Sequence, residues 1–441
     1  MKVVVLGGGS TGEHFVGALR RLDDAVELTL VESRLVGGEC SYFACMPTKT
    51  MLRAAELSSS LERAPGLAPE RPDPAGVWSW RDWMTSDWDD SGQLGWLEEQ
   101  RCDLVRGHGR VARPGVVEVV DGRELAYDRL VVATGSSPAV PPVEGLDGVD
   151  YWTNQDATRT HEVPESLAVL GGGPVGVELA QFFARMGSKV TVIEHGPRLL
   201  GRVHEEAGAL MADVFRGEGI EVRTGVAVER VEPGLRLTLS DGSTVEAERL
   251  LVATGRRPNA AGLGLEQLGV TIGPRGIEVD ERLRAAENVW AIGDVNGVAL
   301  FTHVGKYQAR VAAADLCGRD AKADYRAIPA GIFTDPEVAT VGRTEGDGLV
   351  SARWELGSTP RLSTYERPAR EGFVRVFADP KERVLVGAVA VGPQAAEWLG
   401  QLTLAVRSGT PVDVVLDTIQ PYPTFSEAIF FALRELEDAL A

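Results

Sequence analysis

The chain has 441 residues, of which 44% are hydrophobic and 25% charged, and its formal net charge is −19 at pH 7. This length and composition predict a globular protein of two or three domains and exclude a disordered chain or one built of membrane-spanning segments. Because so negative a chain repels phosphate backbones and anionic lipid surfaces, we expect a small-molecule substrate and neither a nucleic acid nor a membrane as partner.

The first predicted elements are a buried strand, a glycine turn and a helix. The strand KVVVL is followed by Gly7, Gly9 and Gly12 in the spacing G-x-G-x-x-G, and a second strand ends at Glu32, twenty residues after Gly12. This order is typical of dinucleotide binding, in which glycines let the pyrophosphate approach and the carboxylate binds a ribose hydroxyl. A lone glycine motif often marks only a tight turn, but here the whole unit is present.

Cys40 and Cys45 raise the question of a metal site, a structural disulfide or redox chemistry. The apolar run at the N-terminus is too short for a secretory signal, so we expect a cytoplasmic protein, in which a permanent disulfide is rare. A structural zinc site needs more than a pair of cysteines, and Cys102 and Cys317 have no nearby partner, so we expect no metal site. Two inert buried thiols remain an alternative. The position of the pair before a predicted helix favours chemistry, because a helix N-terminus lowers the pKa of a thiol.

Lys49 follows Cys45 by one predicted helical turn. The chain has six lysines among its 45 basic residues, so a lysine at this position suggests that a compact ammonium group is needed there. A solvated surface lysine is the alternative. The two cysteines can form a disulfide only in a loop or a distorted first turn, which Gly37, Gly38 and Pro47 permit.

The strand, turn and helix recur further along the chain. A second strand is followed by Gly171, Gly173 and Gly176, then by a helix and by a strand that ends at Glu194. Two complete units predict two Rossmann-like dinucleotide-binding domains. A related apolar strand and an Ala-Thr-Gly turn, which contains Gly255 in the second unit, close each of them.

Composition then predicts where the domains begin and end. The segment 138–149 is rich in proline and glycine, as a linker is, and after about residue 326 alternating strands and helices indicate a separate α+β domain. We therefore expect an α/β protein with two Rossmann-like domains and a C-terminal α+β domain. The expected parts are a first nucleotide-binding domain in two pieces, 1–142 and 263–325, a second at 143–262, and the C-terminal domain at 326–441.

The segment GGECSYFACMPTK, residues 37–49, resembles the redox-active disulfide segment of the class I pyridine nucleotide-disulfide oxidoreductases, the family of dihydrolipoamide dehydrogenase, glutathione reductase and mercuric reductase. The resemblance covers nearly the whole chain, because both glycine turns, both Ala-Thr-Gly turns, the AIGD segment and the sequence IFTDPEVATVG follow in the family's order. It implies an NAD(P)H-dependent FAD-containing disulfide oxidoreductase. It also implies that the C-terminal domain is a dimerisation domain and that a homodimer shares its active site between subunits.

The resemblance implies a role for each matching residue. Cys40 and Cys45 would form a reversible disulfide, in which Cys45 faces the flavin and Cys40 exchanges with substrate. Lys49 would lie near the flavin and pair with Glu178. Glu194 would bind a ribose hydroxyl of NAD(H) and repel the 2′-phosphate of NADP(H), so NADH is the expected donor. The residues implied in cofactor binding are, for FAD, Gly7, Gly9, Gly12, Glu32, Lys49, Gly109, Thr134, Gly135, Asp294, Leu300, Phe301, Thr302 and His303; for the nicotinamide dinucleotide, Gly171, Gly173, Gly176 and Glu194; and Gly255 in the second Ala-Thr-Gly turn.

Tyr422 is the main departure from the family. The disulfide reductases use a histidine before a proline, oriented by a glutamate, as acid and base, whereas this chain has Tyr422 in the histidine's place and keeps Glu427. No histidine follows His303. A tyrosine ordinarily titrates near pH 10 and a histidine near about 6.5, so a tyrosine does not exchange protons at neutral pH as a histidine does. Tyr422 and Glu427 are nevertheless included among the candidate catalytic residues.

Three functions remain open at this point. The first is an NAD(P)H-dependent disulfide reductase with an unassigned acceptor. The second is a metal or quinone reductase similar to mercuric reductase, although we expect the C-terminal cysteine pair and the N-terminal metal-binding module of those enzymes to be lacking. The third is a non-catalytic flavoprotein whose disulfide senses redox state. Glu39 and the run Tyr42-Phe43-Ala44 are further departures beside the cysteines.

Overall fold

The computed structural model describes all residues, 1–441, and divides into two compact units. The four expected domain parts remain predictions, because the units divide the chain more coarsely. No helix is both long enough and apolar enough to cross a bilayer. Unit 1 comprises Met1–Pro47, Arg81–Ala139 and Gly255–Asp324, and unit 2 comprises Thr48–Trp80, Val140–Thr254 and Tyr325–Ala441.

Unit 1 is built on a six-stranded sheet with the strand order β19-β20-β7-β1-β2-β3. The strands pair in parallel except for β19, and Val4 of β1 lies opposite Thr29 on one side and Leu130 on the other. The central strands β1 and β7 are apolar except at their first residue, because both faces of the sheet are covered. The strands are β1 (Lys2–Leu6), β2 (Glu27–Glu32), β3 (Cys102–Arg106), β7 (Arg129–Val132), β19 (Arg284–Ala286) and β20 (Val289–Ala291).

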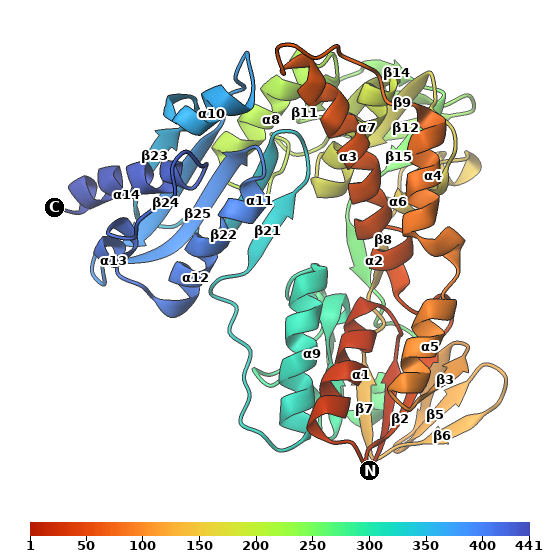
Figure 1. Ribbon diagram of the computed structural model, residues 1–441. Helices are drawn as coiled ribbons and strands as arrows, with labels where there is room; N and C mark the ends of the chain where they lie inside the picture. The colour runs from red at the N-terminus through yellow and green to blue at the C-terminus, as the bar shows by residue number, and fades with distance from the viewer. The chain divides into compact units, whose positions relative to one another are not determined.

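Helices cover one face of this sheet and a second sheet covers the other. Val3 and Val5 of β1 belong to the core beneath the helices, whereas Val4 and Leu6 belong to the core shared with the three-stranded sheet β4-β5-β6. Figure 1 shows α1, α5 and α9 side by side on the first face. These elements are α1 (Ser10–Leu22), α5 (Ser91–Glu99), α9 (Thr302–Leu316), β4 (Gly109–Arg113), β5 (Val116–Val119) and β6 (Glu124–Ala126).

The rest of unit 1 consists of short elements. The strands β8 and β16 form an antiparallel pair, as do β17 and β18, and two helices, α3 and α4, run from one unit into the other. These elements are α2 (Gly38–Tyr42), α3 (Cys45–Glu62), α4 (Pro74–Met84), β8 (Ser136–Pro138), β16 (Arg256–Pro258), β17 (Ile272–Gly273), β18 (Gly276–Ile277) and the 3-10 helices η1 (Ser86–Trp88), η3 (Leu265–Leu268) and η4 (Gly293–Asn296).

The N-terminal part of unit 2 repeats this layered plan. A parallel sheet with the order β11-β10-β9-β15 has Phe182 and Phe183 of α7 on one face and the three-stranded sheet β12-β13-β14 on the other. The elements are β9 (Ser166–Leu170), β10 (Lys189–Glu194), β11 (Glu221–Thr224), β12 (Val228–Glu232), β13 (Arg236–Leu239), β14 (Thr244–Glu246), β15 (Arg249–Val252), α6 (Asn154–Arg159), α7 (Pro174–Met186), α8 (Glu205–Gly217) and η2 (Leu146–Gly148).

The C-terminal part of unit 2 is a five-stranded antiparallel sheet with the order β21-β22-β25-β24-β23. Helices α12 and α14 pack on one face, and Phe373 and Phe377 on the other face join the core that contains α7 and α8. The two Rossmann-like parts and this α+β part confirm the predicted fold class. The elements are β21 (Pro329–Ile332), β22 (Glu337–Gly342), β23 (Val350–Glu355), β24 (Phe373–Asp379), β25 (Val384–Gly392), η5 (Leu356–Ser358), α10 (Pro360–Tyr365), α11 (Ala395–Trp398), α12 (Gly400–Ser408), α13 (Val412–Leu416) and α14 (Glu427–Leu440).

Candidate functional site

The first glycine turn joins β1 to α1, and two of its glycines, Gly7 and Gly12, have no room for a side chain. Gly7 has a φ of +103°, and a Cβ atom there would lie 2.3 Å from the carbonyl oxygen of Ala133. A Cβ atom on Gly12 would lie 2.1 Å from the carbonyl oxygen of Gly7. Glu32, at the end of β2, accepts a hydrogen bond from the Gly8 N–H over 2.7 Å. The turn, the start of α1 and the carboxylate are thus in contact, as dinucleotide binding requires.

The cysteine segment begins beside this turn. The Gly37 N–H donates to the Gly8 carbonyl over 2.8 Å, and a Cβ atom on Gly38 would lie 2.7 Å from the Cα atom of Gly9. Only glycine permits so close an approach at the φ of +62° that Gly38 adopts. Because α2 starts at Gly38, the helix that carries Cys40 lies directly against the glycine turn.

Cys40 and Cys45 are both free thiols, and a hydrogen bond joins them. The Cys45 sulfur, on the first residue of α3, lies 3.4 Å from Oγ1 of Thr302, the first residue of α9. The hydrogen bond to Cys45 and burial raise the pKa of the Cys40 thiol, and Thr302 and Lys306 oppose this. The expectation of a lowered thiol pKa at this helix start is therefore wrong for Cys40, because the neighbouring sulfur holds its proton in place.

The segments that follow the two Ala-Thr-Gly turns lie side by side in unit 1. The strands β8 and β16, which follow them, pair antiparallel. The Thr134 hydroxyl donates to the Asn259 carbonyl over 2.8 Å, and the Asn259 N–H donates to the Gly135 carbonyl over 2.9 Å. Gly255 accepts from the Ala139 N–H over 2.9 Å. Thr134, Gly135 and Gly255 are thus brought together by backbone hydrogen bonds, and their contact with a cofactor remains a prediction.

Asp294 lies beside the paired strands β8 and β16. Its Oδ2 accepts a hydrogen bond from the Ser136 hydroxyl over 2.6 Å, and Arg256 donates to the hydroxyl and the carbonyl of Ser136. Burial raises the pKa of the Asp294 carboxyl, and Ser136 and Arg256 partly oppose that. Arg256 also donates to Glu39 over 3.2 Å. The sequence reasoning missed Ser136 and Arg256, although each directly follows an Ala-Thr-Gly turn, and that was the available signal.

The remaining residues expected to bind FAD are not all at this place. Residues 300–303 lead into α9, and the rings of Phe301 and His303 stack with 5.2 Å between their centroids. Gly109, in contrast, is the first residue of β4, where a Cβ atom would lie 2.9 Å from the Leu6 side chain. Close packing therefore requires a glycine at this position, and the contact of Gly109 with a cofactor remains a prediction.

In unit 2, Lys49 and Glu178 form an ion pair with 2.7 Å between Nζ and Oε2. The Glu178 side chain is only 5% exposed and that of Lys49 34%. The other Glu178 oxygen accepts a hydrogen bond from the Phe333 N–H over 2.8 Å, and the Lys49 Nζ lies 4.8 Å from the centre of the Phe333 ring. Both carboxylate oxygens are therefore bonded. Phe333 is a third member of this group that the sequence reasoning missed.

The second glycine turn repeats the geometry of the first. Gly171 has a φ of +113°, and a Cβ atom on Gly176 would lie 1.9 Å from its carbonyl oxygen. Gly173 is the residue before α7. Glu194, at the end of β10, accepts hydrogen bonds of 2.6 Å from the N–H groups of Gly172 and Gly196. The second turn thus has the arrangement that dinucleotide binding requires, and its contact with the nicotinamide dinucleotide remains a prediction.

The C-terminal candidates, Tyr422 and Glu427, are not hydrogen-bonded to each other. The Tyr422 side chain is 71% exposed, whereas one carboxylate oxygen of Glu427, at the start of α14, is buried and has no hydrogen-bond partner. The arrangement offers no acid and base pair of the histidine and glutamate kind. Their catalytic roles remain predictions.

Comparison with known proteins supports the resemblance seen in the sequence. Residues 1–315 match the family profile described as pyridine nucleotide-disulphide oxidoreductase, and residues 328–432 match that of its dimerisation domain. The chain is similar to a dihydrolipoyl dehydrogenase of Thermus scotoductus, with 35% identity over 98% of this chain and 97% of the relative. It is also similar to a mercuric reductase of Shigella flexneri, with 34% identity over 98% of this chain and 80% of the relative.

Solved structures show the same fold. The structure of LpdA from Mycobacterium tuberculosis aligns with a TM-score of 0.89 and 26% identity, and the alignment covers 99% of both chains. The HOCl-induced flavoprotein disulfide reductase RclA from Escherichia coli aligns with a TM-score of 0.86 and 23% identity over 100% of both chains.

Proposed function

The chain belongs to the pyridine nucleotide-disulphide oxidoreductase family, and we propose that its electrons leave for an external acceptor through Cys40 and Cys45. It is an FAD-dependent oxidoreductase that uses NAD(P)H and a redox-active disulfide. The observation that carries the proposal is the position of the two cysteines, on α2 and at the start of α3, directly against the first glycine turn. Which nucleotide and which acceptor it uses are the open parts of the function.

The residues of unit 1 fit FAD. The cradle formed by Gly7 and Gly12 has no room for side chains, Glu32 lies at its edge, and Asp294 supplies a buried carboxyl group. We propose that these residues, with Thr134, hold the cofactor. When bound, FAD takes a hydride from the nicotinamide dinucleotide and supplies a pair of electrons to the disulfide.

The two cysteines would have different tasks. A pair of electrons breaks the S–S bond, and one proton is then sufficient to leave a thiol at Cys40 and a thiolate at Cys45. The raised pKa of Cys40 and its hydrogen bond to Cys45 favour this distribution of the proton. Thr302, whose hydroxyl lies 3.4 Å from the Cys45 sulfur, can donate a hydrogen bond to the thiolate.

The proposed roles of residues in unit 2 concern the nicotinamide dinucleotide and the flavin. We propose that Glu194, at the second glycine turn, binds the ribose hydroxyls of NADH. Glu178 would hold the Lys49 ammonium group in place, because its carboxylate oxygen lies 2.7 Å from Nζ. Lys49 and Glu178 are therefore proposed to act as a unit at the flavin.

Anaerobic titration with dithionite tests the role of the cysteines. The wild-type protein should take up about four electrons per flavin, two for FAD and two for the disulfide, and Cys45→Ser should take up about two. Cys102→Ser, which removes a buried thiol from β3, is the matched control and should still take up about four. If the wild type stops at about two, the cysteine pair is not in redox contact with FAD and the proposal fails.

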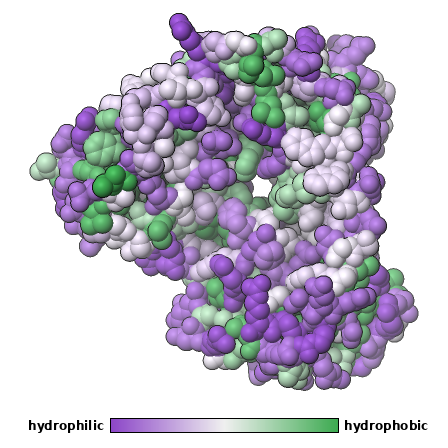
Figure 2. All heavy atoms as spheres, viewed as in Figure 1, coloured by the Kyte–Doolittle hydropathy of each residue, from purple (hydrophilic) through white to green (hydrophobic).

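We further propose a homodimer that forms through the C-terminal domain. This domain matches a dimerisation domain, and it exposes Leu404, Val414, Ile419 and Tyr422, which are large apolar side chains that a monomer would leave in water. Figure 2 shows hydrophobic residues gathered over this part of the chain, whereas unit 1 is mostly hydrophilic on the face drawn. Light scattering during size-exclusion chromatography should give twice the chain mass of 47.2 kDa.

A second candidate acceptor is a metal ion. Tyr422 in the place of the family's histidine favours it, because reduction of a metal ion requires no proton transfer to a thiol leaving group. NADH oxidation with disulfides, quinones and soft metal ions as acceptors would separate the candidates, and turnover with none of them would favour a redox sensor. A cytoplasmic location remains a prediction.

A further inference from the structure

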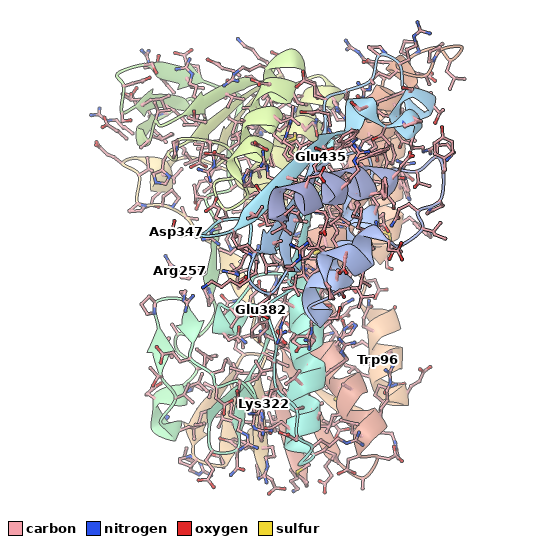
Figure 3. The ribbon with its side chains drawn as sticks, turned by 90° about the vertical axis from the view of Figure 1, so that its left-hand side faces the viewer. Trp96, Arg257, Lys322, Asp347, Glu382 and Glu435 are labelled. Carbon is pink, nitrogen blue, oxygen red and sulfur yellow. The ribbon has the colours of Figure 1, made fainter.

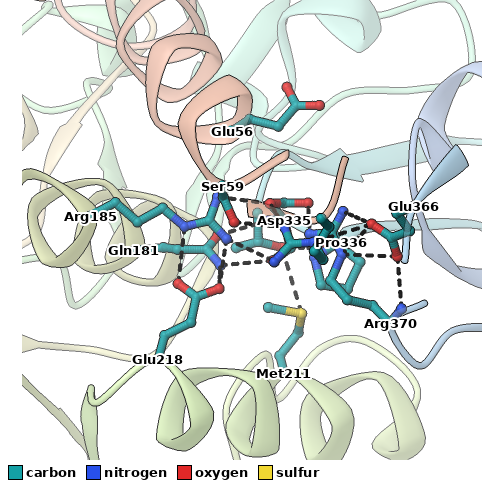
Figure 4. Close-up of polar contacts among 12 residues, drawn as sticks. Glu56, Ser59, Gln181, Arg185, Met211, Glu218, Asp335, Pro336, Glu366 and Arg370 are labelled. Atoms are coloured by element: carbon teal, nitrogen blue, oxygen red, sulfur yellow. Dashed lines mark hydrogen bonds and ion pairs between the residues drawn. The ribbon is translucent and has the colours of Figure 1, made fainter. Parts of the chain in front are cut away.

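A cluster of ionised side chains in unit 2 is not used by the function proposed above (Figure 4). Asp335, which is 8% exposed, contacts Arg185 at 2.8 Å, Arg63 at 3.3 Å and also Arg370. Arg63 follows α3, Arg185 lies on α7 and Arg370 precedes β24, so three segments that are distant in sequence meet at one carboxylate. The other carboxylates of the cluster are Glu218, which binds Arg185, and Glu366, which binds Arg63 and Arg370.

Stability alone does not explain this cluster. Burial raises the pKa of the Asp335 carboxyl, but Arg185, Arg370 and Arg63 outweigh it and hold the pKa below the ordinary value, so Asp335 is ionised. Buried ionic clusters are often no more stabilising than well-packed apolar side chains of similar volume, whereas they do fix the geometry of the groups they connect. The geometry that this cluster fixes is that of the segment around Asp335.

Gln181 holds the main chain at the same residue. Its side chain is almost completely buried, its Oε1 accepts from the Asp335 N–H over 2.7 Å, and its Nε2 donates to the Asp335 carbonyl over 2.8 Å. Asp335 is therefore held by both main-chain polar groups and by its carboxylate. So many directional bonds leave this segment a single position relative to α7.

The fixed segment ends at the ion pair of the proposed active site. Phe333, two residues before Asp335, donates its N–H to Glu178, and the other oxygen of that carboxylate binds Lys49. Glu178 and Gln181 are three residues apart on α7, so both side chains point to the same side of the helix. Both bind the main chain of residues 333–335.

We propose that Gln181 is a positioning residue for the Lys49–Glu178 pair. By fixing the main chain of Asp335, Gln181 keeps the Phe333 N–H bonded to one oxygen of Glu178. That bond orients the carboxylate and so determines the position of the oxygen that binds Lys49. The inference rests on the proposed role of Lys49 and Glu178 at the flavin. Without the Gln181 bonds, the carboxylate loses the partner that sets its orientation, and the ammonium group moves with it.

The test is a double-mutant cycle on the flavin-loaded protein. Gln181→Met keeps the length and volume of the side chain but loses both hydrogen bonds to Asp335 and a third to Glu218, and it should slow the reduction of flavin by NADH about tenfold in stopped-flow measurements. Glu178→Gln should also slow it, and Gln181→Met should add nothing in the Glu178→Gln background.

Amide hydrogen exchange gives a second readout that is independent of turnover. Gln181→Met should speed exchange at Phe333 and Asp335, whose N–H groups are both hydrogen-bonded in the wild type. Ser188→Ala is the matched control, because it removes another buried side-chain hydrogen bond, to the Pro164 carbonyl, just after α7. It should lower the melting temperature but leave flavin reduction and the exchange at residues 333–335 unchanged.

The outcomes separate this inference from the proposed function. If Glu178→Gln reduces its flavin as fast as the wild type, the ion pair has no role in flavin reduction. The proposed role of Lys49 and Glu178 and the positioning role of Gln181 then both fall. If Glu178→Gln is slow but Gln181→Met adds its full effect in that background, only the positioning role falls. Unchanged exchange at Phe333 and Asp335 in Gln181→Met would overturn it as well.

Discussion

Arg256 donates a hydrogen bond to Glu39 over 3.2 Å, so a charged pair forms at the residue that precedes Cys40. Both side chains are largely buried, and Arg256 is also bonded to Ser136, which in turn binds Asp294. The family resemblance led us to note Glu39 as a departure. The structure gives it a partner, and the pair can influence the redox potential of the neighbouring disulfide.

We expect Glu39 and Arg256 to shift that potential in opposite directions. Glu39→Gln removes a negative charge near the sulfurs, which stabilises the reduced, thiolate form and should raise the midpoint potential by about 20 mV, equivalent to about 1 kcal/mol. Arg256→Met leaves Glu39 without its partner and should lower the potential by a similar amount. Equilibration of the flavin-loaded protein with dithiothreitol buffers measures both changes.

Arg257 provides the control for this pair. It follows Arg256 directly but is exposed at the surface (Figure 3), so Arg257→Met changes the net charge equally without touching Glu39. It should leave the potential within a few millivolts of the wild type, because solvent screens an exposed charge. Shifts of the same sign in Glu39→Gln and Arg256→Met would contradict the electrostatic explanation.

Glu194 should make the protein prefer NADH. Its carboxylate is held by the N–H groups of Gly172 and Gly196, where it can bind ribose hydroxyls but would repel a 2′-phosphate. We expect kcat/KM to be at least about tenfold higher with NADH than with NADPH, a difference of about 1.4 kcal/mol, and Glu194→Gln to narrow it.

Arg198 is the basic residue most able to reverse this preference, and its geometry argues against that. Its guanidinium donates to the carbonyls of Gly201 and Val203, so it is engaged by its own loop. Arg198→Ala should therefore change the rates with NADH and NADPH by the same factor. A preference for NADPH that Arg198→Ala abolishes would show that Arg198 binds the 2′-phosphate.

Glu337 should make the stability of the protein fall between acid and neutral pH. Burial raises its pKa from 4.5 to about 7, and the hydrogen bond from the Ala396 N–H only partly opposes this. Since the folded state holds this proton to a higher pH than the unfolded state, stability is lost as the pH rises from about 4.5 to about 7. Glu337→Gln should thus be more stable than the wild type at pH 8, by up to about 3 kcal/mol, and similar to it near pH 4.

Urea unfolding at the two pH values measures this difference. Glu397→Gln is the control, because Glu397 is exposed and its charge only adds to the effect at Glu337. It should change stability by less than about 0.5 kcal/mol at either pH. Equal stability of Glu337→Gln and the wild type at pH 8 would mean that Glu337 is ionised without cost.

The sequence predicted the parts of the site that local motifs define. Each glycine turn, its strand and its acid occupy one continuous segment, so the pattern alone predicts that Glu32 and Glu194 lie at the edges of the two turns, where they accept hydrogen bonds from Gly8 and Gly172. The cysteine pair was found for the same reason. The pKa of Cys40 was not predicted correctly, because it depends on which sulfur holds the shared proton and not on the start of the helix.

The contacts that the sequence did not reveal join residues far apart in the chain. Arg256 and Glu39 are separated by 217 positions, and Asp335 and Gln181 by 154. No local period or spacing links such residues, because their meeting depends on how whole elements pack. The motif IFTDPEVATVG was recognised in the sequence, but only the structure shows that its main chain binds Glu178 and Gln181 of α7.

Tyr422 leads to the last prediction, poor turnover with lipoamide. Oxidation of dihydrolipoamide needs a base to take a thiol proton as the dithiol attacks Cys40, and a positioned base contributes roughly 10²- to 10⁴-fold. Tyr422 is exposed and has no hydrogen bond to Glu427, one of whose oxygens is buried without a partner.

We therefore expect flavin reduction by NADH to be fast and lipoamide turnover slow. Tyr422→His, which supplies a side chain that ordinarily titrates near neutral pH, should raise lipoamide turnover at least about tenfold and leave flavin reduction unchanged. Tyr422→Phe is the matched control and should alter neither rate, since it keeps the ring and removes only the hydroxyl. Stopped-flow reduction beside steady-state turnover measures both rates in the three proteins. Efficient lipoamide turnover by the wild type, retained in Tyr422→Phe, would show that a base elsewhere serves the disulfide.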